Sequence, residues 1–162
     1  MRRLTISSDA CAETLAILVA IAWADGRIDE REKASVRGAS QIFNLTKEQR
    51  AQIDGMLEKA STLDAVHVDR LKERDRDFAY VAAAWMCGVD EEVAGKEEGM
   101  LWRLSDLLSI DDERKTELEA VARSLSAAKG APRQWGDELA ALFKSIPPRL
   151  DPGAGDIEVT FE

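Results

Sequence analysis

Two stretches of the sequence resemble each other closely: residues 19–26 read VAIAWADG, and residues 81–88 read VAAAWMCG. Further along, residues 41–45 (QIFNL) match residues 106–110 (DLLSI). The spacing between the copies is 62 residues for the first match and 65 for the second, so the second copy has about three extra residues between its two matches. Matched positions over about forty residues predict an internal duplication.

Each copy has the pattern of an apolar helix, an acidic loop with a glycine, an amphipathic helix, a short turn and a third helix. The helix that ends near Ala24 is apolar on nearly every side, which predicts a central place in a bundle. Asn44 is suited to end the second helix, and residues 46–49 read as a capping box that begins the third. Asp111 or Asp112 caps the corresponding helix of the second copy.

These patterns predict an all-α, single-domain bundle of seven to eight helices, built from two related three-helix halves. The duplicated domain is expected over residues 1–130, a C-terminal amphipathic helix over 131–148 and an extended acidic tail over 149–162. Residues 61–77 are charged and predict a short helix with an exposed face. Within the tail, residues 157–161 (IEVTF) alternate apolar and polar side chains, as a strand added to another element would.

Composition excludes several classes of protein. The chain has 162 residues, a net charge of −9 and 45% hydrophobic residues, which fits one folded domain and not a disordered chain. Its longest apolar stretch, residues 15–24, has half of the ~20 residues that cross a bilayer. We expect no export signal, no membrane insertion, a cytoplasmic protein, and no binding of nucleic acid, because an acidic surface repels phosphate.

The few cysteine and histidine residues exclude other chemistry. Cys11 and Cys87 are the only cysteines and make no disulfide framework, and His67 is the only histidine. Zinc sites built on histidine are therefore excluded, and no glycine-rich phosphate loop is present. We expect a protein that is not an enzyme.

The acidic residues gather in the two loops of the duplication. Residues 25–32 hold four acids and two arginines, and residues 88–98 hold five acids and one lysine. Together the two loops account for six of the nine net negative charges. In the first loop, Asp29 and Glu32 have the spacing of a capping box, which is a purely structural role.

The same carboxylates would also suit a metal site. Hard cations such as Ca²⁺ or Mg²⁺ take several oxygen ligands, and Asp25, Asp29 and Glu32 bracket a tight turn. If the two loops face each other, Asp90 and Glu97 would complete a shared site for a divalent cation. The spacing of an EF-hand is absent.

The loop that reads AWADGRIDERE (residues 22–32), placed after an alanine-rich helix and repeated about sixty residues later, resembles the TerB-like domain of tellurite resistance proteins. The resemblance covers roughly residues 10–126, although Cys87 stands where the second loop should have an aspartate. It implies an all-helical, non-enzymatic domain that binds a divalent metal through Asp25, Asp29, Glu32 and, less firmly, Glu97. It also implies a role in bacterial resistance to tellurite, chemical stress and phage, beside partners that are often membrane-anchored.

The sequence thus predicts a cation-binding helical protein that acts through protein partners in a stress response. Two alternatives remain at this stage. The first is a metal-free helical adaptor whose loop acids only cap helices. The second is a metal-dependent hydrolase built on clustered carboxylates, for which the chain offers no clear nucleophile.

Overall fold

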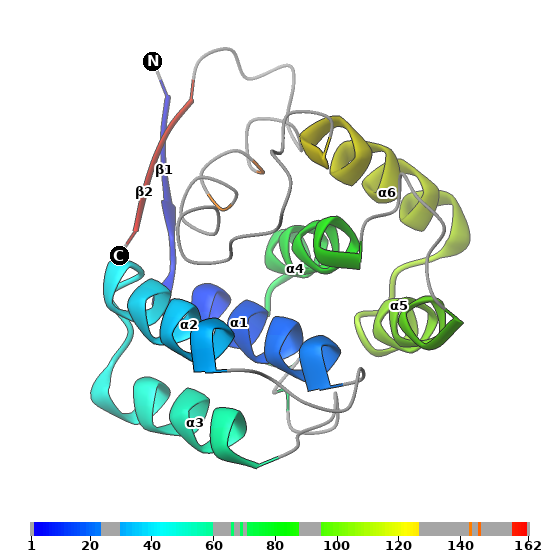
Figure 1. Ribbon diagram of the computed structural model, residues 1–162. Helices are drawn as coiled ribbons and strands as arrows, with labels where there is room; N and C mark the ends of the chain where they lie inside the picture. Colours follow the sequence, from blue (N-terminus) through cyan, green and yellow to red (C-terminus); the bar gives the residue numbers. More distant parts are fainter. Residues whose placement is uncertain are drawn as a thin grey trace.

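The computed structural model of the chain is mostly helical, with six helices and two short strands in the part that it describes (Figure 1). In chain order these elements are β1 (Arg2–Ile6), α1 (Ser8–Trp23), α2 (Glu30–Ile42), α3 (Lys47–Glu58), α4 (Glu73–Cys87), α5 (Gly95–Leu107), α6 (Asp112–Ser126) and β2 (Ile157–Phe161). The structure describes residues 2–23, 30–59, 66, 69, 71–87, 95–126, 143, 146 and 157–161. Apart from the two strands, this confirms the predicted all-α class.

Helices α1 and α4 lie at the centre of the fold and pack against each other. Every side chain from Ala10 to Ile21 on α1 is buried, as is every side chain from Phe78 to Trp85 on α4. Helix α3 packs on α1, whereas α5 and α6 pack on α4. A helix that is apolar on all sides is stable only inside a protein, and the central place predicted for α1 is therefore confirmed.

The turn between α2 and α3 and the turn between α5 and α6 have the same geometry. Each passes through a residue with positive φ, Asn44 at 57° and Ser109 at 58°. In each turn two amides donate back to carbonyls of the preceding helix, which is the pattern of a Schellman motif. These hydrogen bonds are Asn44 N to Gln41 O (3.3 Å), Leu45 N to Ser40 O (3.3 Å), Ser109 N to Asp106 O (3.1 Å) and Ile110 N to Ser105 O (2.9 Å).

Both following helices begin with a side-chain cap. Thr46 Oγ1 accepts from the amide of Gln49 (3.1 Å) and Gln49 Oε1 accepts from the amide of Thr46 (2.9 Å), so the predicted capping box is confirmed. Gln49 Nε2 also donates to Asp9 on α1 (2.8 Å), which ties α3 to the central helix. On α6, the carboxylate of Asp111 accepts from the amide of Arg114 (2.8 Å), so Asp111 is the capping residue of the two candidates.

The two strands pair with each other, although β1 lies at the start of the described residues and β2 at their end. Strands β1 and β2 run parallel, with Arg2 opposite Ile157 and Ile6 opposite Phe161. The alternation of residues 157–161 predicts the second strand, but nothing in our sequence analysis predicts the first. A five-residue segment has little local signal of its own, and β1 is defined by a partner that lies 155 positions later in the sequence.

The C-terminal segment contributes to the core through two described residues. Phe143 and Ile146 have no exposed surface. The ring of Phe143 stacks on Phe43 at 4.5 Å between centroids and meets the edge of Phe78 at 4.9 Å. The rest of the amphipathic helix expected over 131–148 lies outside the described residues, as does most of the short helix expected within 61–77.

Candidate functional site

The five residues of the predicted metal site are only partly within the described structure. Asp25, Asp29 and Asp90 lie outside the described residues. The backbone places Glu32 in the first turn of α2 and Glu97 in the first turn of α5, each as the third residue of its helix. The structure therefore gives the backbone positions of two of the five acidic residues. That the five carboxylates converge on one site stays a prediction.

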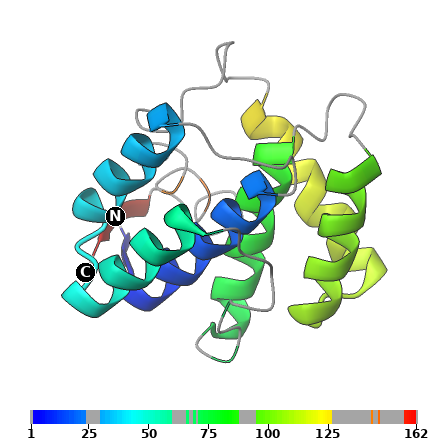
Figure 2. The same ribbon diagram turned by 60° about the horizontal axis from the view of Figure 1, so that its bottom comes forward.

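The helix ends that border the two acidic loops point to the same side of the molecule in Figure 2. The first loop joins the end of α1 to the start of α2, and the second joins the end of α4 to the start of α5. A tryptophan lies close to each loop. Trp23 donates from Nε1 to the carbonyl of Met56 on α3 at 2.8 Å, and Trp85 is buried with 3% exposure.

Near the first loop, the described acids are paired with surface cations. Lys33 lies 3.3 Å from Glu30 and 4.0 Å from Glu58, and Arg37 lies 3.1 Å from Asp54 and 2.7 Å from Glu58. The hydrogen bonds that Arg37 donates, first to Glu58 and then to Asp54, raise the pKa of Arg37. The Arg37 pairs are largely exposed, and such pairs contribute little to stability. The pairs with Asp54 and Glu58 link α2 to α3.

Within the described ranges, no three histidine, cysteine, aspartate or glutamate side chains are grouped so as to hold a metal ion. The only metal ligands that the sequence predicts are the loop acids. Among the described helices, none is long and apolar enough to cross a membrane.

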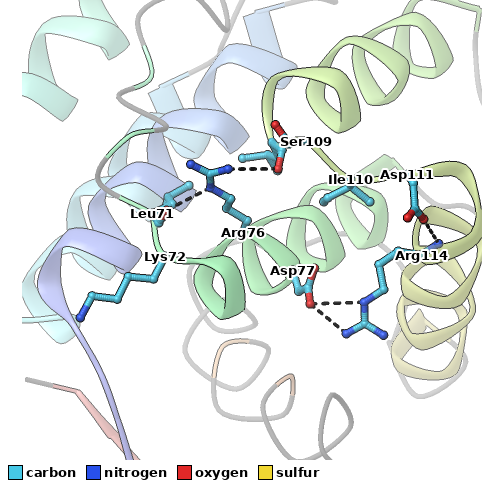
Figure 3. A pocket seen from close by; sticks show the side chains of 9 residues that line it. Leu71, Lys72, Arg76, Asp77, Ser109, Ile110, Asp111 and Arg114 are labelled. Carbon is cyan, nitrogen blue, oxygen red and sulfur yellow. Dashed lines mark hydrogen bonds and ion pairs between the residues drawn. The ribbon is translucent and has the colours of Figure 1, made fainter.

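A pocket of about 640 Å³ lies where the start of α4 meets the turn between α5 and α6 (Figure 3). We call it the α4–α6 pocket. It is lined by Leu71, Lys72, Arg76, Asp77, Leu108, Ser109, Ile110, Asp111 and Arg114. Our sequence analysis predicted a charged short helix over residues 61–77 and a helix cap at Asp111 or Asp112, but no pocket.

The two acids of the α4–α6 pocket are already engaged. The guanidinium of Arg114 donates to Asp77 Oδ2 from Nη2 (2.8 Å) and Nε (3.3 Å), and to Glu117 from Nη1 (2.7 Å). These hydrogen bonds, that of Asp77 first, raise the pKa of Arg114. Asp111 caps α6 through its bond to the amide of Arg114.

Arg76 has a different kind of partner. Its Nε donates to the carbonyl of Leu71 (3.0 Å) and its Nη1 to the carbonyl of Leu108 (3.5 Å), so the side chain ties the segment before α4 to the end of α5. No ion pair joins Arg76 or Lys72 to a described carboxylate. The lining is thus polar and includes two cations without a described acidic partner. Residues 72–77 are all charged, which is a sequence signal for this region. Acids and bases alternate there, however, so the sequence does not tell which of these side chains line a pocket.

Comparison with known proteins gives a family but no activity. A search of curated proteins and of solved structures found no significant match to the chain. The profile of a protein family described as "Protein of unknown function (DUF533)" matches residues 6–122, which is well over half of the chain and spans α1 to most of α6. The chain therefore belongs to the DUF533 family.

Proposed function

We propose that this chain is a non-enzymatic, TerB-like helical domain that binds a divalent cation at its two acidic loops and acts on a protein partner in a bacterial stress response. The site would draw on Asp25, Asp29 and Glu32 from the first loop and on Asp90 and Glu97 from the second. Ca²⁺ and Mg²⁺ are the candidate ions, because both prefer carboxylate and carbonyl oxygens.

The first support for this proposal is a duplication of helix boundaries, which favours two related halves, α1–α3 and α4–α6. Helix α2 spans residues 30–42 and α5 spans 95–107, so both ends differ by the 65 residues that the sequence match predicts. Helices α3 and α6 begin at residues 47 and 112, again 65 residues apart.

The turns support the same relationship at the level of single atoms. Asn44 and Ser109, with φ of 57° and 58°, differ by 65 positions, and so do the hydrogen bonds around them. Ser40 Oγ donates to the carbonyl of residue 37, and Ser105 Oγ donates to the carbonyl of residue 102, both at 2.8 Å. Unrelated helical hairpins have no reason to share every one of these contacts.

The observation that carries the proposed function is that this correspondence extends to the acids. Glu32 and Glu97 are the third residues of matched helices, and each follows an acid-rich loop. Two equivalent loops would thus present carboxylates from equivalent positions. A bound cation would cancel the repulsion between them and fix one half against the other.

The metal-free adaptor explains the same acids by helix capping alone. A carboxylate in the first turn of a helix is stabilising because it faces the positive end of the helix dipole. On that account Asp29→Ala would cost about 1 kcal/mol of stability and would leave the response to ions unchanged. The ion titration described next separates the two proposals.

The test is a titration of the full chain with Ca²⁺ and, separately, Mg²⁺, followed by tryptophan fluorescence and calorimetry. We expect saturable binding below about 1 mM and a rise in Tm, since an ion that binds only the folded state stabilises it. Asp25→Asn and Glu32→Gln should abolish both signals. Glu113→Gln is the matched control, because Glu113 is an exposed glutamate in the first turn of α6, outside the loops. Absence of saturable binding in the unmodified chain would overturn the proposal.

The remaining parts of the proposal follow from the resemblance and not from the described residues. They are a cytoplasmic location, partners that are often membrane-anchored, and a role in resistance to tellurite, chemical stress or phage. Cross-linking in cells under tellurite stress, followed by identification of captured proteins, addresses them. Capture that depends on Asp25 would link the partner to the cation.

A further inference from the structure

We propose that the α4–α6 pocket binds a small molecule that carries an oxyanion, a carboxylate or a phosphate, on an apolar body. This site is separate from the proposed cation site. It involves none of the loop acids, and its test does not depend on whether a metal binds.

The charges of the pocket favour an anion. Of its five ionisable residues, Asp77 and Asp111 are acids, and both are engaged with Arg114 through its side chain and its amide. Lys72 and Arg76 remain, and neither has an ion-pair partner among the described residues. Lys72 is exposed and Figure 3 shows its side chain extending away from Arg76, so Arg76 is the closer of the two to the centre of the lining. The lining thus carries three cations against two carboxylates, an excess of one positive charge in a chain whose net charge is −9.

The geometry of Arg76 makes it the principal ligand. Its side chain is partly buried, and the carbonyls of Leu71 and Leu108 hold Nε and Nη1 in place. Nη2 donates no hydrogen bond to any described acceptor. A guanidinium held in this way loses little further freedom when it binds, and its planar donors suit carboxylate and phosphate oxygens. Figure 3 shows Arg76 between Leu71 and Ser109, at the centre of the lining.

The apolar part of the lining indicates what should carry the anion. Leu71 and Leu108 are buried, with 2% and 1% exposure, and Ile110 is half-buried at the pocket wall. A volume of about 640 Å³ is within the range of pockets that hold small organic ligands. Inorganic phosphate would fill only a fraction of it. A compact ring or short hydrocarbon that bears a single anionic group fits both features.

The first half of the molecule provides a contrast within the same chain. With the 62-residue spacing of the first match, the counterpart of Arg76 is Thr14, which is fully buried in α1 with no hydrogen-bond partner for its hydroxyl. With the 65-residue spacing, the counterpart of Arg114 is Gln49, whose side chain closes the capping box and binds Asp9. The cations of the pocket are therefore particular to the second half.

The experiment is an NMR titration of the isotope-labelled full chain with phenyl phosphate and, in a separate arm, benzoate. Sodium chloride is kept near 0.15 M, where charges beyond about 8 Å are screened. We expect saturable shifts of the amides of Arg76, Ser109, Ile110 and Arg114 in at least one arm. The arm that binds more tightly tells whether the site prefers phosphate or carboxylate.

Three variants make the result specific. Arg76→Gln should weaken binding about tenfold, which corresponds to about 1.4 kcal/mol, and Lys72→Glu should weaken it severalfold. Because Arg76 also holds two carbonyls, Lys72→Glu serves as the variant that leaves these hydrogen bonds intact. Lys47→Glu is the matched control, since Lys47 is exposed in the first turn of α3 and the charge change is identical.

Two outcomes would overturn the proposal. One is the absence of saturable shifts with both probes at concentrations up to about 20 mM. A simple anionic fragment is expected to bind with a millimolar Kd, so this range would detect it. The other is equal weakening by Lys47→Glu and Lys72→Glu, which would mean that the probes respond only to the overall charge of the protein.

Discussion

Among the residues that the structure describes, Cys11 has the largest pKa shift. It lies on α1 with no exposed surface, and burial, together with the charge of Asp75, raises the pKa of its thiol well above the ordinary range. The folded protein therefore favours the protonated thiol well above the pH at which a free cysteine ionises. Because the thiolate is the reactive form, we expect Cys11 to be inert toward thiol reagents until the chain unfolds.

The same shift makes a prediction about stability and pH. In the unfolded chain the Cys11 thiol ionises near pH 8.5, whereas in the folded chain it keeps its proton. Above that pH the unfolded state binds fewer protons, so the free energy of unfolding falls as pH rises. Between pH 8 and pH 10 the unmodified chain should lose about 2 kcal/mol more than Cys11→Ala. Urea unfolding of both proteins at the two pH values measures this, and equal losses would contradict it.

Single residues also show which contacts could be predicted from the sequence and which could not. The capping residues Thr46 and Gln49 were predictable, because a cap depends on side chains three positions apart. The role of Arg76 was not, because its two carbonyl partners belong to Leu71 and Leu108. The second of these lies 32 positions away, and no local pattern records such a contact.

At the scale of elements, the C-terminal segment is the one whose contribution can be tested most directly. Phe143 contacts two aromatic rings, Phe43 from the α2–α3 turn and Phe78 from α4, and has no exposed surface. We expect Phe143→Ala to lower the free energy of unfolding by about 3–5 kcal/mol, because it removes a buried ring and leaves a cavity. Chemical denaturation measures the change.

Trp102→Ala is the control for this prediction. Trp102 is 57% exposed on α5 and meets Lys115 only at the surface, 4.4 Å from the ring centroid. Its removal should cost no more than about 1 kcal/mol. A Phe143→Ala effect as small as that of Trp102→Ala would mean that the C-terminal segment is not part of the cooperative core.

Most elements were predictable for a physical reason. Helices α2, α3 and α6 each have a stop or start signal within a few residues of their ends, and the apolar positions of these helices and of α5 recur at helical spacing. The central helices α1 and α4 were predictable from continuous apolar runs. Strand β1 was not, since its existence depends on pairing with β2 rather than on its own residues.

For the molecule as a whole, removal of one strand tests whether the β1–β2 pair unfolds separately from the helices. A chain that ends at residue 156 would lack β2 but keep all six described helices. In hydrogen exchange we expect the amides of residues 2–6 to lose protection, while those of α1 and α4 stay among the slowest, because they form the buried centre. Uniform loss of protection would contradict this, and would mean that the strands and helices unfold as one unit.

The candidate sites differ in how they could be found. The proposed duplication and its acidic loops can be predicted from the sequence, because both copies lie in one chain and can be compared letter by letter. The α4–α6 pocket joins residues 71–77 to residues 108–114 across two helices and a turn. Its chemistry appears only when the fold brings those segments together.

The parallel pairing of β1 with β2 also sets an order of events during biosynthesis. Arg2 pairs with a residue that is made 155 positions later, and ribosomes add about 5–20 residues per second. The first strand therefore waits on the order of 10–30 seconds for its partner. During that time the helices that follow it can already have packed. Until synthesis reaches β2, residues 2–6 of the nascent chain therefore have no strand partner, although the core can already receive Ile6.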